Sequence, residues 1–143
     1  MDEIIVAYWS GGGNTEAMAK AVAKGIEDAG KKAKVCFVDD ISASDLKDAS
    51  CFALGCPAMG DEVIEETSME PFVAEVEGFC AGRTVALFGS YDWGDGQWMR
   101  DWTQRMQDAG AFIVNDEGLI ANNEPQDEDL ANCEALGKAL ASR

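Results

Sequence analysis

Residues 4–15 read IIVAYWSGGGNT and join a continuous apolar run to a loop of small polar residues. An unbroken apolar run is typical of a strand that is buried on both faces of a sheet. Over residues 15–29 the apolar side chains Met18, Val22 and Ile26 recur at every fourth position, which places them on one face of a helix. The stretch therefore predicts a buried strand, a glycine-rich loop and a helix that begins at the loop.

The same alternation of apolar runs and helix-period segments continues along the chain. Further strands are expected over residues 35–38, 51–56, 84–88 and 111–114, the last with a possible continuation through residues 119–120. Further helices are expected around residues 44–48, 71–76, 99–109 and 130–140. Five strand–helix repeats predict an α/β fold with a parallel sheet covered by helices on both faces. Because 143 residues make one domain's worth, we expect a single domain over residues 1–143.

The chain is acidic, with 11 Lys and Arg against 27 Asp and Glu, a formal net charge of −16 and no histidine. This charge disfavours binding to nucleic acid or to an anionic membrane, and it favours a basic partner. The missing histidine excludes Ser-His-Asp and Cys-His nucleophiles.

The longest uncharged runs, residues 4–15 and 49–60, are far shorter than the roughly 20 residues of a membrane helix. The N-terminus begins Met1-Asp2-Glu3, acidic where an export signal would be basic, so we expect a cytoplasmic protein.

The five cysteines form an odd, scattered set, which suggests reduced thiols packed in the core. They are Cys36, Cys51, Cys56, Cys80 and Cys133. The spacing of Cys51 and Cys56 matches part of a plant-type iron–sulfur pattern, but the remaining ligands at short spacing are missing. We therefore expect no metal site.

The first loop, Ser10–Thr15, holds three glycines and three side chains that form hydrogen bonds. Glycines let successive backbone N–H groups face one concavity, and a helix N-terminus adds partial positive charge there. This combination predicts an anion site, and we interpret the anion as a phosphate. The loop lacks both the Gly-Lys-Ser/Thr of a nucleotide-hydrolysing P-loop and the glycine order of a dinucleotide site. The alternative is a glycine-rich turn that only reverses the chain.

Two later loops add an apolar slot to this predicted site. Residues 57–62 read PAMGDE and present Met59 at a rim, where a polarizable thioether suits an aromatic face. Residues 90–96 read SYDWGDG, and Trp93 in this loop is well placed to stack on a flat ligand. The alternatives are an ordinary surface turn and a tryptophan folded back over the sheet edge. Ligands of open parallel sheets bind beyond the carboxyl ends of the strands, so the three loops together suit a flavin mononucleotide.

In nearly its whole length, the chain resembles the flavodoxins, and specifically their short-chain clostridial type. The matching motifs are VAYWSG (6–11), GNTE (13–16), GCPAMGDE (55–62), EPF (70–72), VALFGSY (85–91), WGDG (93–96), WMRDW (98–102) and NEP (123–125). The resemblance implies a flavodoxin-like three-layer sandwich with strand order 2-1-3-4-5 and FMN at the switch point, the arrangement for which flavodoxin is the type example.

The resemblance also implies the function: a low-potential one-electron carrier that holds FMN non-covalently and has no NAD(P)H oxidoreductase activity of its own. Met59 would cover the inner face of the ring and Trp93 the outer face. The Gly60–Asp61 peptide would turn its carbonyl toward flavin N5–H on one-electron reduction, and Glu62 would meet the pyrimidine edge. Within the implied set, Ser10, Gly11, Gly13, Asn14 and Thr15 would hold the phosphate, and Glu124 would lie near the ring without stacking on it. The whole implied FMN-binding set is Trp9, Ser10, Gly11, Gly12, Gly13, Asn14, Thr15, Pro57, Ala58, Met59, Gly60, Asp61, Glu62, Ser90, Tyr91, Asp92, Trp93 and Gly94.

Two positions depart from the family pattern. Gly12 stands where relatives usually have Thr, so one hydroxyl donor is lost and weaker phosphate binding is expected. Asp92 stands where close relatives have Gly, so we expect a strained loop and an added carboxylate near the ring.

Two stretches, residues 48–82 and 106–137, each carry eight acidic residues and no basic one. They are either solvated acidic faces or docking surfaces to which redox enzymes with basic faces bind transiently. We expect the protein itself to be a monomer. One alternative function is a flavodoxin-fold quinone or flavin reductase that uses NAD(P)H, but the chain has neither an insertion nor a basic cluster beside the loops. The other alternative is a phosphoacceptor receiver domain, which needs an acidic cluster after the first strand and an Asp after the third. Trp9-Ser10 and Cys56-Pro57 stand at these positions, so we reject this alternative.

Overall fold

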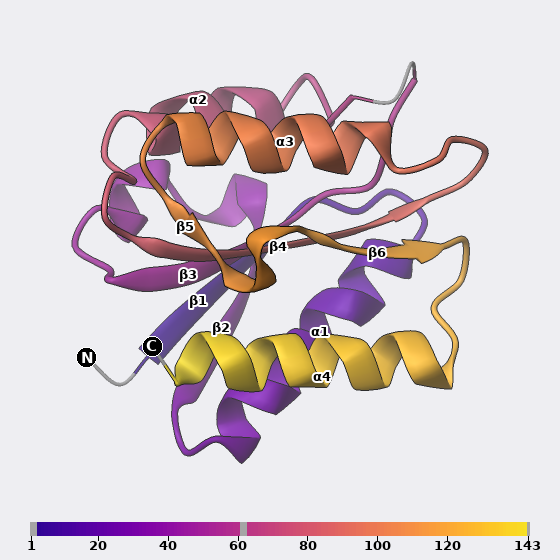
Figure 1. Ribbon diagram of the computed structural model, residues 1–143, viewed down its shortest axis with the longest axis horizontal. Helices are drawn as coiled ribbons and strands as arrows, with labels where there is room; N and C mark the ends of the chain where they lie inside the picture. Colours follow the sequence, from indigo (N-terminus) through magenta and orange to yellow (C-terminus); the bar gives the residue numbers. More distant parts are fainter. Residues whose placement is uncertain (1–2, 61–62, 143) are drawn as a thin grey trace.

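The computed structural model describes residues 3–60 and 63–142. Its strands are β1 (Glu3–Tyr8), β2 (Lys32–Phe37), β3 (Cys51–Gly55), β4 (Thr84–Tyr91), β5 (Phe112–Ile113) and β6 (Leu119–Asn122). They form one parallel sheet in the order β2-β1-β3-β4-β5, with β6 also paired to β4 (Figure 1). The expected order 2-1-3-4-5 is confirmed.

The fifth position of the sheet holds two short strands. β5 pairs with the beginning of β4, and β6 pairs with its end. Between them lies a 3-10 turn, η3 (Val114–Asp116), in which Asn115 and Asp116 have φ of 64° and 63°. A strand cannot continue through two left-handed residues, so the expected single strand is broken here.

The helices are α1 (Asn14–Asp28), α2 (Met69–Glu77), α3 (Gln97–Asp108) and α4 (Asp127–Ala141), with short 3-10 turns η1 (Val38–Asp40) and η2 (Ala43–Leu46) after β2. α1 and α4 cover one face of the sheet, and α2 and α3 cover the other (Figure 1). The helix face expected from Met18, Val22 and Ile26 is confirmed, since all three side chains are fully buried. None of the helices in residues 3–60 and 63–142 is long and apolar enough to cross a membrane.

Helices α1 and α4 meet at two glycines. A Cβ at Gly25 would overlap the carbonyl oxygen of Glu134, and a Cβ at Gly137 would overlap that of Val22. Each helix therefore lacks a side chain where the backbone of the other passes. This close approach fixes α1 and α4 against each other on the same face of the sheet.

Candidate functional site

The loops that follow β1, β3 and β4 converge at the carboxyl edge of the sheet, as expected. They surround an open cavity of about 300 Å³. Its lining is Trp9, Ser10, Gly11, Gly12, Asn14, Thr15, Pro57, Ala58, Met59, Ser90, Tyr91, Asp92 and Asn123. The volume lies at the lower end of the range for small-molecule sites, about 300–1,000 Å³.

Some members of the expected set lie outside this lining. Gly13, Gly60, Trp93 and Gly94 sit in the same loops without lining the cavity. Asp61 and Glu62 lie outside the described residues. Conversely, Asn123 lines the cavity although the sequence argument assigned it no binding role.

Asn123 follows β6 and closes the cavity from the side of β4. It has φ of 58°, and its N–H donates to the Tyr91 carbonyl at 2.7 Å. Asparagine is one of the few residues that readily adopts the left-handed conformation. The signal that could have found it is therefore an Asn directly beyond a strand at the carboxyl edge of the sheet.

The first loop is built as a cradle for an anion. Gly13 has φ of 96° and precedes α1 without a side-chain cap. This conformation favours glycine, and N–H groups of the first helical turn are left available to a ligand. The Gly13 N–H donates to Ser10 Oγ at 3.1 Å, which closes the loop on itself. A Cβ at Gly12, in contrast, would meet nothing within 4 Å, so no crowding requires the glycine there.

Two buried hydroxyls line the floor of this cradle. Thr15 Oγ1 lies 2.9 Å from Ser90 Oγ, and the two residues are 1% and 5% exposed. When Ser90 donates to Thr15, the Thr15 proton is free to bind an acceptor in the cavity. Asp92 carries the one carboxylate in the described lining. Neutral donors at a helix N-terminus fit the phosphate of FMN, and the neighbouring Trp9, Ala58 and Met59 fit an aromatic ring system.

The second loop is a tight turn closed by its own backbone. Met59 and Val63 exchange two hydrogen bonds, with N···O distances of 2.8 and 3.0 Å. Gly60 follows Met59 with φ of 48°. The Ala58 N–H donates to the Ser90 carbonyl at 2.9 Å, which ties the loop to the end of β4. Met59 is thus presented on a stem that is hydrogen-bonded on both sides.

Beyond this turn, a buried carboxylate anchors the chain to α2. Glu65 is 7% exposed and accepts from the N–H groups of Thr67 (2.8 Å), Ser68 (2.7 Å) and Met69 (2.9 Å). Burial by itself raises the pKa of this carboxyl, but the backbone donors outweigh it and leave the pKa below its ordinary value. Glu65 therefore caps α2 as an anion and fixes the end of the segment that carries Met59.

Glu65→Gln should lower the free energy of unfolding at pH 7 by about 1–3 kcal/mol, because it removes the charge from a buried carboxylate that accepts from three backbone N–H groups. The pKa of Glu65 is lower in the folded state, so its stabilising effect is present above the unfolded-state pKa of about 4.3 and is lost as pH falls through the folded-state pKa. Urea unfolding at pH 7 and pH 3.5 should show the gap between wild type and variant shrinking. Glu66→Gln, at an exposed neighbour, is the control; an equal gap at both pH values would contradict this role of Glu65.

The third loop leaves Trp93 in solvent, with the side chain 71% exposed. The alternative of an indole folded back over the sheet edge is therefore wrong. The expected backbone strain at Asp92 is also not found, since the described non-glycine residues with positive φ are Asn115, Asp116 and Asn123. Trp98, by contrast, is buried, and its Nε1 donates to the Cys56 carbonyl at 3.1 Å.

The expected packing of the cysteines is confirmed for four of the five: all are free, and all but Cys51 are buried. Burial raises the pKa of Cys56 and of Cys133 to about 12, which keeps both thiols protonated and unreactive. Over residues 3–60 and 63–142, no group of three or more His, Cys, Asp or Glu side chains is placed to hold a metal ion.

Comparison with known proteins gives one family across most of the chain. Residues 6–136 match the family model described as flavodoxin. The chain is 47% identical over 137 residues to a flavodoxin of Clostridium beijerinckii, covering 96% of this chain and 98% of that one. It is 39% identical over 136 residues to a flavodoxin of Megasphaera elsdenii, covering 95% and 96%.

Solved structures of flavodoxins share the fold of this chain. The solution structure of two-electron reduced Megasphaera elsdenii flavodoxin superposes with a TM-score of 0.86 at 37% identity, over 98% of this chain and 99% of that one. A flavodoxin from the domain Archaea superposes with a TM-score of 0.87 at 31% identity, over 98% and 96%.

Proposed function

Because this chain belongs to the flavodoxin family of small FMN-bound electron carriers, we propose that its three convergent loops hold the cofactor as a clamp with two ends. The phosphate occupies the cradle Ser10–Thr15, and the ring lies between Met59 and Trp93. The observation that carries this assignment is the pairing, in one cavity, of neutral donors at a helix N-terminus with an apolar slot.

When bound, FMN supplies reversible electron uptake and release. The protein's part is binding and orientation. Backbone N–H groups and Thr15 hold the phosphate, while the Met59 thioether and the Trp93 indole cover the two faces of the ring and keep water from them. The Gly60 carbonyl would accept a hydrogen bond from flavin N5–H, a role that glycine suits because its peptide turns at little cost. Asp61 and Glu62 complete this edge in the proposal.

The chain works as a carrier and not as an NAD(P)H oxidoreductase. No Lys or Arg belongs to the described lining of the cavity, so no cation there pairs with the additional phosphates of a nicotinamide nucleotide. Mixing the FMN-loaded protein with NADPH or NADH should therefore leave the flavin absorbance unchanged until a separate flavodoxin reductase is added. Bleaching by either nucleotide alone, at the rate seen with reductase, would overturn the carrier assignment.

The carrier's partners are redox enzymes with basic docking faces, and it meets them as a cytoplasmic monomer with a low reduction potential. The net charge of −16 supports electrostatic docking, and negative charge near the ring disfavours added electrons. Five free cysteines suit a reducing compartment. The large exposed apolar side chains of the described residues come from four different segments, which supports a monomer; they are Val35, Val63, Trp93 and Phe112.

The double charge reversal Glu62→Lys and Glu66→Lys should slow electron transfer from a basic reductase at low ionic strength, because it weakens the attraction that speeds the encounter. Stopped-flow rates would measure this, and the difference from wild type should shrink as salt rises. A matched control reverses Glu27 and Glu75, exposed residues near the C-terminal ends of α1 and α2, away from the site. Equal slowing by both double variants would assign the effect to net charge and contradict a docking face at residues 62–66.

A further inference from the structure

Trp93 stands in a loop that owes its position to polar contacts at its two ends. The indole is largely exposed, so packing against the core does not fix it. Hydrogen bonds reach this loop from Asn122 at one end and from Arg100 at the other. We propose that Asn122 and Arg100 are positioning residues that orient Trp93 for the flavin ring. This inference rests on the proposed function of Trp93.

The first end is a side-chain extension of the sheet. The parallel pairing of β4 with β6 ends at Tyr91 and Asn122. One residue further along, the Asn122 side chain replaces the backbone: its Nδ2 donates to the carbonyls of Asp92 at 3.1 Å and of Tyr91 at 3.3 Å. Asn123 Nδ2 donates in turn to Asn122 Oδ1 at 3.3 Å, which holds the Asn122 amide in the orientation that points its donors at β4.

The second end is held by the first turns of α3. Side chains on a helix tilt toward its N-terminus, so Arg100 reaches back to the residue before the helix cap. Its Nη1 donates to the Asp95 carbonyl at 3.1 Å, and its Nη2 lies 3.0 Å from the Asp95 carboxylate. The Asp95 carbonyl lies before the helix cap, outside the i→i−4 hydrogen bonds of the helix backbone. The Arg100 side chain donates to it instead.

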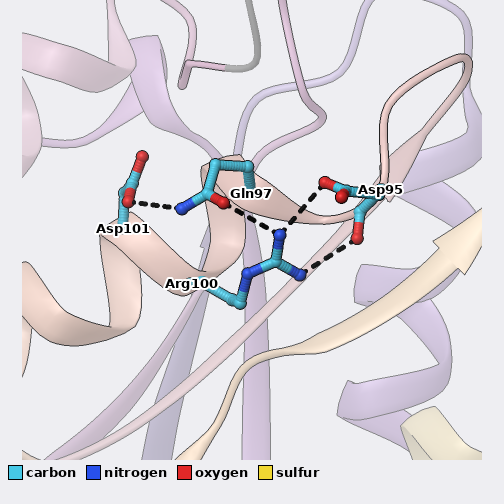
Figure 2. A network of polar contacts seen from close by, with 4 residues as sticks. All are labelled: Asp95, Gln97, Arg100 and Asp101. Carbon is cyan, nitrogen blue, oxygen red and sulfur yellow. Dashed lines mark hydrogen bonds and ion pairs between the residues drawn. The ribbon is translucent and has the colours of Figure 1, made fainter.

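Gln97 fixes the guanidinium in turn, as Figure 2 shows. Its Oε1 accepts from Arg100 Nη2 at 2.9 Å, and its Nε2 donates to Asp101 Oδ1 at 2.8 Å. The planar fork of Arg100 is thus held between Gln97 and Asp95, a geometry that a lysine cannot reproduce.

The two contacts matter for binding more than for folding. Asn122, Arg100 and Asp95 are exposed, and exposed polar pairs add little to global stability. They do, however, restrict the loop before the ligand arrives, and a preorganised loop loses less entropy on binding. Asn122→Ala and Arg100→Ala should therefore each weaken FMN binding by about threefold to tenfold, the effect of losing one or two hydrogen bonds, while the urea midpoint of the apoprotein stays at the wild-type value.

A double-mutant cycle with Trp93→Ala tests whether the effect passes through the indole. FMN affinity is measured by flavin fluorescence for wild type, Asn122→Ala, Arg100→Ala and Trp93→Ala, and for each positioning variant combined with Trp93→Ala. The inference predicts that the positioning variants cause no further weakening once Trp93 is absent. Equal weakening with and without the indole, or unchanged affinity in both single variants, would overturn it.

Two further variants separate positioning from charge and from general surface effects. Arg100→Lys keeps the charge but loses the fork, so its affinity should follow Arg100→Ala; full wild-type affinity would assign the effect to charge and overturn the inference. Gln104→Ala, on the exposed face of the same helix, is the matched control and should bind FMN as wild type does. If Trp93→Ala itself binds FMN like wild type, the stacking proposal fails together with the positioning role; if only the positioning variants are silent, the positioning role alone fails.

Discussion

Thr15→Val is expected to weaken FMN binding by about tenfold to one-hundredfold while leaving riboflavin binding almost unchanged. The substitution keeps the shape of a side chain that is 1% exposed and removes only its hydroxyl. A hydrogen bond to a charged group contributes about 1.5–3 kcal/mol, which corresponds to this change in affinity. Riboflavin has the ring but no phosphate, so it does not use the cradle.

The measurement is a fluorescence titration of each apoprotein with FMN and with riboflavin. Thr103→Val is the matched control, since Thr103 is also buried and its hydroxyl accepts from the Gly118 N–H at 3.2 Å, on α3 and outside the cradle. It makes the same chemical change and should leave the ratio of FMN to riboflavin affinity as in wild type. Equal weakening of both ligands by Thr15→Val would mean that the hydroxyl supports the fold and does not contact the phosphate.

Gly137→Ala is expected to lower the free energy of unfolding by about 1–3 kcal/mol, the usual effect of overpacking. In an ordinary helix interior this change stabilises by about 0.5–1 kcal/mol, so the sign alone is informative. The reason is the contact between α1 and α4, where a Cβ at Gly137 would overlap the Val22 carbonyl oxygen and come within 3.0 Å of Ile26 N. These are backbone atoms, which cannot move aside without shifting α1.

Urea unfolding of the apoprotein measures this effect. Asn132→Ala, at an exposed position of α4, serves as the control and should leave the stability unchanged or slightly raised, because alanine is the better helix former. FMN affinity of Gly137→Ala should fall as well, since the N-terminus of α1 forms part of the cradle. A Gly137→Ala protein as stable as wild type would contradict the close approach of the two helices.

Sequence reasoning predicted the strands and the loops of the site because their signals are local, whereas the order of the strands came from the family resemblance. An apolar run followed by glycines marks a buried strand and its turn, and residues 4–15 show both. The break between β5 and β6 was not predicted, since nothing in the letters of Asn115 and Asp116 requires positive φ at both. Gly25 and Gly137 likewise carry no local sign that they face another helix.

Sequence reasoning missed residues whose contacts depend on how the elements are placed in space. Asn122 contacts Asp92 from 30 residues away, and Arg100 acts on the loop through a helix that had to be placed first. Glu65 looks like one acid among many in residues 48–82, and only the structure shows its burial and its backbone donors. The strain expected at Asp92 was wrong because the loop takes its turn without a left-handed residue there.

The central claim is that a neutral cradle at residues 10–15 holds a phosphate while Met59 and Trp93 enclose the attached ring. A crystal structure of the protein with FMN tests it most directly. The account predicts the phosphate within hydrogen-bonding distance of Thr15 Oγ1 and of backbone N–H groups in the cradle, with the ring between the Met59 thioether and the Trp93 indole. A phosphate bound elsewhere, or a ring that touches neither side chain, would contradict the account.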